Sequence, residues 1–102
     1  MASFLEGKVV VVIGGGNDAH RGVAVALAQA GANIAVAGSA ADLTAEAALH
    51  SIANEIWAIG RRSTVVTLTD NDSSAFAAAL SSVTAELGSV DLVVRCDAVL
   101  SA

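Results

Sequence analysis

The chain has 102 residues, a formal net charge of −5 and an apolar fraction of 55%, which indicates one small domain, 1–102, that buries about two-thirds of its unfolded surface. The N-terminal segment lacks a secretory-type apolar region, and the apolar runs, such as Val9–Ile13, are far too short to span a bilayer, so we expect a cytoplasmic protein. Its cationic side chains are few and scattered, which argues against a nucleic acid or an anionic membrane as partner; they are Lys8, Arg21, Arg61, Arg62 and Arg95.

Hydrophobic runs of strand length alternate along the chain with longer segments of helical periodicity. The first run, Lys8–Ile13, is rich in valine and uninterrupted, which predicts a strand buried on both faces. A glycine-rich segment follows, and then apolar residues at helical spacing (Val23, Leu27 and Ala30) predict a helix that stops at Gly31. The run Asn33–Gly38 predicts the second strand.

A second helix and a third strand are predicted in the middle of the chain. The helix lies within the segment 39–60, and Gly60 ends it. The run Ser63–Leu68 predicts the strand. The apolar stripe of the helix comprises Leu49, Ile52, Ile56 and Ile59.

The last third of the chain predicts one more helix and one more strand. Either Asp72 or Ser73 is expected to cap the helix, which continues to Leu87. Its buried face is expected to comprise Phe76, Leu80, Val83 and Leu87. The run Val90–Arg95 predicts the fourth strand.

Four strands thus alternate with three helices, which is the order that gives a parallel sheet with right-handed crossovers. We therefore predict the α/β class and a doubly wound parallel sheet. No proline, linker or repeat divides the chain, so a single domain, 1–102, is expected.

Two segments resemble the short-chain dehydrogenase/reductase (SDR) family. Leu5–Ser39 has the family's Leu-x-Gly-Lys start, valine-rich strand, glycine loop, helix and second strand. Ala85–Val99 stands where the family has its Phe-Gly-x-Leu-Asp-x-Leu-Val-Asn-Asn-Ala-Gly segment. The resemblance covers essentially the whole chain but only the first half of the family's domain. It implies a truncated Rossmann-like domain with four strands in the order 3-2-1-4 and three helices.

The same resemblance implies NAD or NADP as the cofactor, held by the glycine-rich loop after the first strand. The family's first loop glycine is present as Gly14, whereas its second falls on Asp18 and its third on His20. A carboxylate at the second position opposes a pyrophosphate that would bind at the positive end of a helix.

A second register of the loop retains more of the dinucleotide fingerprint. Gly14, Gly16 and Ala19 fit the pattern Gly-x-Gly-x-x-Gly/Ala between a strand and a helix. In this register Asn17 or Asp18 caps the helix. Two interpretations stay open, a cofactor-binding loop and a glycine-rich turn that serves only the fold.

The remaining cofactor positions depart from the family's pattern. Ser39 stands where an acidic residue would bind the ribose hydroxyls, and Asp42 lies beyond the turn. Thr69 takes the place of the family's adenine-contacting aspartate, and Asp70 is one position late. The segment Arg95–Ala98 replaces Asn-Asn-Ala-Gly. The candidate cofactor-binding residues are therefore Gly14, Gly16, Ala19 and Ser39.

Catalysis in the family uses a Tyr-x-x-x-Lys pair that exchanges a proton with the substrate while hydride moves. The chain has no tyrosine, and its single lysine, Lys8, begins the first strand. We therefore assign no catalytic residue and no metal ligand. A nucleophilic pair of Cys96 and His20 is an alternative. The simpler interpretation is that Cys96 is buried, His20 begins a helix and His50 lies on the surface.

The fourth strand predicts an interface. One helix, Ser73–Leu87, is expected to leave part of a sheet face and the edge of this strand uncovered. The run Asp91–Val94 has no proline or lysine to block pairing, and an exposed apolar patch marks an interaction site. We expect a homodimer, or docking on a second polypeptide, through the fourth-strand edge and the uncovered sheet face.

Three functions follow from these patterns. The one we favour is a degenerate SDR-like Rossmann module, a pseudoenzyme without catalytic residues that acts as a structural or regulatory subunit. The second is the NAD(P)-binding part of an oxidoreductase whose Tyr-x-x-x-Lys lies on another chain or a removed segment. The third is a small-ligand binding module that uses the same crevice.

Overall fold

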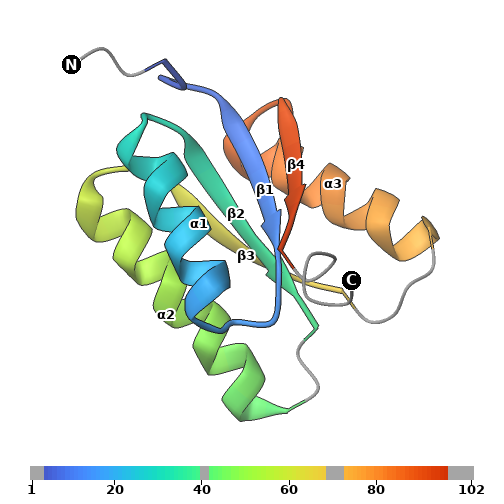
Figure 1. Ribbon diagram of the computed structural model, residues 1–102. Helices are drawn as coiled ribbons and strands as arrows, with labels where there is room; N and C mark the ends of the chain where they lie inside the picture. The colour runs from blue at the N-terminus through green and yellow to red at the C-terminus, as the bar shows by residue number, and fades with distance from the viewer. Residues whose placement is uncertain (1–3, 40–41, 69–72, 97–102) are drawn as a thin grey trace.

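The computed structural model describes residues 4–39, 42–68 and 73–96. Within these residues, strands and helices alternate along the chain (Figure 1). The strands are β1 (Val9–Ile13), β2 (Asn33–Gly38), β3 (Ser63–Thr67) and β4 (Leu92–Arg95). The helices are α1 (Asp18–Gln29), α2 (Leu43–Ile59) and α3 (Ser73–Leu87).

The described strands form one parallel sheet in the order β3-β2-β1-β4. Helices α1 and α2 cover one face of this sheet, and α3 covers the other (Figure 1). The α/β class, the doubly wound arrangement and the strand order predicted from the sequence are confirmed.

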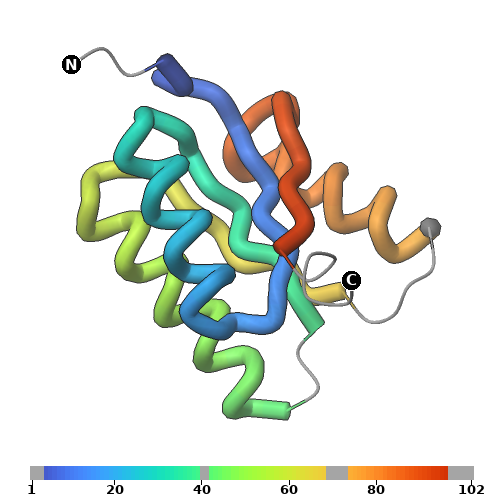
Figure 2. The backbone as a smooth tube through the Cα atoms, in the orientation of Figure 1, coloured from blue at the N-terminus to red at the C-terminus, as the bar shows by residue number. Residues whose placement is uncertain are grey.

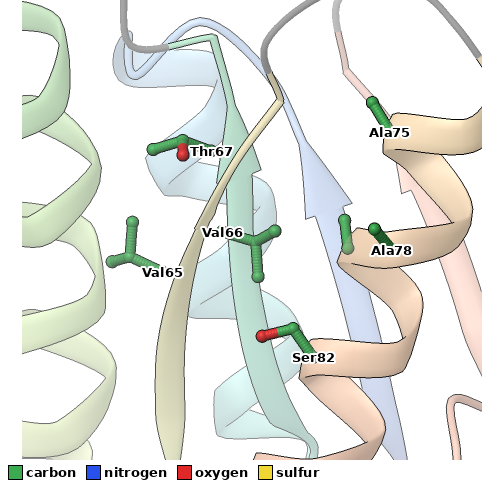
Figure 3. A pocket seen from close by; sticks show the side chains of 7 residues that line it. Val65, Val66, Thr67, Ala75, Ala78 and Ser82 are labelled. Carbon is green, nitrogen blue, oxygen red and sulfur yellow. The ribbon is translucent and has the colours of Figure 1, made fainter.

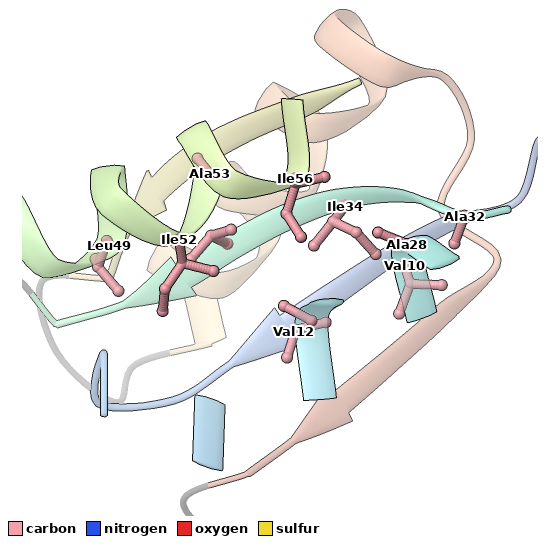
Figure 4. Close-up of a cluster of buried hydrophobic side chains, with 11 residues drawn as sticks. Val10, Val12, Ala28, Ala32, Ile34, Leu49, Ile52, Ala53 and Ile56 are labelled. Atoms are coloured by element: carbon pink, nitrogen blue, oxygen red, sulfur yellow. The ribbon is translucent and has the colours of Figure 1, made fainter. Parts of the chain in front are cut away.

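The central strands are buried on both faces. All five residues of β1 are buried, as the uninterrupted valine run predicts. Alternate β1 side chains enter two separate apolar clusters, because successive side chains of a strand point to opposite faces. Val10 and Val12 face α1 and α2, in the cluster shown in Figure 4. Val9, Val11 and Ile13 face α3.

Helix α1 packs on the sheet mainly through alanine side chains. Ala24 and Ala28 are fully buried, together with His20 one turn earlier. The residues that signalled the helix in the sequence, Val23 and Leu27, are only partly buried and lie beside this stripe. Gly31 follows the helix with φ of +108°, as expected of a glycine that stops a helix.

Helix α2 begins after Asp42, whose carboxylate accepts a hydrogen bond from the amide of Ala45 at 2.8 Å. Leu49, Ile52 and Ile56 are buried as predicted. The prediction for Ile59 is wrong, because its side chain is 37% exposed. Ile59 lies about 60° around the helix from Ile56, on the flank of the stripe; the other buried residue of the helix is Ala53.

Helix α3 covers one face of the central strands. Val83 and Leu87 are buried, and Phe76 and Leu80 are partly buried against the same cluster. The helix begins at Ser73, and the alternative cap, Asp72, lies outside the described residues. The central strands are therefore covered on this face. The exposed apolar side chains of the described strands lie on β4, where Leu92 is 47% exposed and Val93 is 37% exposed.

Gly38 provides a test of how closely the β1–α1 loop packs on β2. A Cβ at this position would overlap the carbonyl oxygen of Gly14 and contact Leu49 at 3.1 Å. We expect Gly38→Ala to lower the free energy of unfolding by about 1–3 kcal/mol, because neither backbone nor core can move aside freely.

The matched control is Gly22→Ala, the same change at a helical position where a Cβ meets no atom within 4 Å. This variant should be more stable by about 0.5–1 kcal/mol, because alanine is the better helix former. Urea unfolding followed by far-ultraviolet circular dichroism measures both. Equal free energies of unfolding of the two variants would contradict the close approach of the Gly14 carbonyl and Leu49 to Gly38.

Candidate functional site

The candidate site lies at the carboxyl edge of the sheet, between β1 and β4. These neighbouring strands are the point at which the strand order reverses, because α1 follows β1 on one face while α3 leads into β4 from the other (Figure 2). In open parallel sheets, ligands bind in the crevice at this switch point. The loop between β1 and α1 follows the carboxyl end of β1 and so lies at this switch point.

Hydrogen bonds from backbone amides fix the start and the end of this loop. The amide of Gly14 donates to the carbonyl of Ala37 at 3.0 Å, which extends the pairing of β1 with β2. At the other end, Asn17 caps α1, since its side chain accepts from the amide of His20 at 3.0 Å. Asp18 is therefore the first residue of the helix and not its cap.

His20 is the organising side chain beneath the loop. Its imidazole is fully buried. Nε2 lies 2.9 Å from the carbonyl oxygen of Val12, and Nδ1 accepts a hydrogen bond from the amide of Gly16 at 3.0 Å. Because a carbonyl can only accept and an amide can only donate, these two contacts require the neutral ring with its proton on Nε2. His20 thereby joins strand β1 to the loop.

Packing and backbone conformation explain why glycine stands at two positions of the loop. A Cβ on Gly14 would stand 2.6 Å from Cγ of His20, so the ring occupies the space that a side chain would need. Gly16 has φ of +79°, a conformation that side chains other than hydrogen disfavour. A Cβ on Gly15 would meet no atom within 4 Å. Packing and conformation thus account for Gly14 and Gly16 without any ligand.

Charged side chains flank the start of α1. The Asp18 carboxylate is fully exposed and lies 3.4 Å from the Arg21 guanidinium, which also lies 3.4 Å from Glu55 on α2. Asp18 therefore does not fill the loop. It adds negative charge at the first turn of the helix, where Arg21 partly offsets it.

The four candidate cofactor residues lie along the same edge of the sheet. Gly14 is buried and Gly16 is partly buried, whereas Ala19 in the first turn of α1 is exposed. Ser39 follows β2 and is exposed. The ends of β1 and β2 are adjacent in the register, with Ile13 beside Ala37, which brings the loop and Ser39 to one side of the molecule. Their role toward a cofactor stays a prediction.

The remaining chemical candidates from the sequence are His50 on α2 and Cys96 after β4. His50 is exposed on α2, as expected, with Nε2 3.9 Å from the Glu46 carboxylate. Cys96 is only partly buried; it follows β4 and donates its amide to the carbonyl of Ile13 at 2.8 Å. Both ring nitrogens of His20 contact backbone atoms, so its structural role is the one that sequence reasoning missed. The available signal was its position, where the family has a glycine that packs helix on strand.

A shallow groove of about 380 Å³ opens between β3 and α3 (Figure 3). Small apolar side chains line it, with two hydroxyl groups from Thr67 and Ser82. None of its lining residues is charged. Within the described residues, no cluster of three or more histidine, cysteine or acidic side chains is placed to hold a metal ion. The same residues contain no helix long and apolar enough to cross a membrane.

Comparison with solved structures confirms the resemblance to the SDR fold. A short chain dehydrogenase from Mycobacterium avium superposes with a TM-score of 0.81 at 26% identity, over 93% of this chain and 34% of that one. A dehydrogenase/reductase from Sinorhizobium meliloti 1021 gives 0.78 at 26% identity, over 89% and 34%. A short-chain type dehydrogenase/reductase from Mycobacterium marinum gives 0.75 at 28% identity, over 91% and 37%.

The chain thus has the fold of a Rossmann half of these enzymes and spans about a third of the length of the solved structures that it matches. No protein-family model and no curated protein sequence matches it.

Replacement of His20 tests its role as the link between β1 and the loop. We expect His20→Ala to lower the free energy of unfolding by about 2–4 kcal/mol, because it leaves a buried cavity and an amide without its acceptor. His50→Ala removes the same ring from an exposed site and should change stability by less than about 0.5 kcal/mol.

Denaturant unfolding followed by circular dichroism compares the two histidine variants. Fluorescence of Trp57 is a poorer probe, because this side chain is already 74% exposed in the folded chain. A His20→Ala variant as stable as His50→Ala would contradict the proposed link.

Proposed function

We propose that the chain is a Rossmann module of SDR type with a structural or regulatory role, which neither holds a dinucleotide in its glycine loop nor transfers hydride by itself. The observation that carries this proposal is the hydrogen bond from the Gly16 amide to Nδ1 of His20. In dinucleotide-binding loops, backbone amides of this kind point at the pyrophosphate. Here the protein's own side chain takes that amide.

The charge and the residue types at the carboxyl edge of the sheet support the same proposal. The exposed carboxylate of Asp18 stands at the helix start, where a bound pyrophosphate would place its own negative charge. Ser39 offers a hydroxyl where an acidic side chain would bind the ribose. The residues present therefore do not fit a dinucleotide. The 102 residues also contain no tyrosine for the family's proton transfer.

A second candidate function is the dinucleotide-binding part of an SDR-type oxidoreductase. It is favoured by the loop conformation, since Gly16 keeps a positive φ between a strand and a helix at the switch point. It requires His20 to release the Gly16 amide when the pyrophosphate binds. It also requires a catalytic Tyr-x-x-x-Lys from outside these residues, which purification from the source cells would detect in an associated chain.

Thermal unfolding with nicotinamide dinucleotides separates the two functions. We expect the midpoint to stay unchanged in millimolar NAD⁺, NADH, NADP⁺ or NADPH. A ligand present at a hundred times its dissociation constant would add about 2.7 kcal/mol and raise the midpoint visibly. Such a rise would overturn our proposal and favour the second candidate.

Gly15→Val is the control for where a ligand acts. A Cβ at this position meets no protein atom within 4 Å apart from its chain neighbours, so the variant should fold. It would nevertheless project from the loop. If a midpoint rise seen with the original chain disappears in Gly15→Val, the dinucleotide binds at the loop; if it persists, the dinucleotide binds elsewhere.

A further inference from the structure

We draw no further inference here: the strongest candidate, the exposed apolar side chains of Leu92 and Val93 on strand β4, carries none, because nothing in the structure shows what covers them.

Discussion

The buried ring of His20 determines how the first strand, the glycine loop and the first helix fit together. It contacts the carbonyl of Val12 with one nitrogen and the amide of Gly16 with the other. The ring occupies the space beside Gly14, so that position has no room for a side chain. The carbonyl of Gly14 in turn presses against Gly38 at the end of β2. The position of one imidazole thus limits side-chain size at Gly14 after β1, and the carbonyl of Gly14 limits it at Gly38 in β2.

The same constraint explains how a Rossmann loop can keep its shape without a ligand. In dinucleotide-binding proteins, the glycines of this loop let the backbone approach a pyrophosphate, whose charges interact with the loop amides. Here an internal acceptor satisfies one of those amides, and buried backbone donors need such partners. The fold of this loop is therefore compatible with the absence of a ligand, since an acceptor within the protein already satisfies this amide.

The periodicity of the sequence predicted the elements because local patterns reflect burial directly. The valine run of β1 is buried throughout, and the stripe of α2 matches at Leu49, Ile52 and Ile56. Predictions failed where burial depends on neighbours distant in the chain. Ile59 lies at the end of a helix beyond the covered stripe, and α3 shields the central strands more fully than a count of helices suggested.

The sequence by itself determined the α/β class, the strand order expected from its resemblance and the glycine-rich loop at the switch point, because these follow from residue type and spacing along the chain. Only the tertiary structure decided which groups the glycine loop contacts. Whether His20 faces solvent, a ligand or Val12 depends on how closely α1 approaches the sheet, which small residues such as Ala24 and Ala28 allow. Helical spacing cannot encode that distance, because it results from packing between segments that meet only in the folded chain.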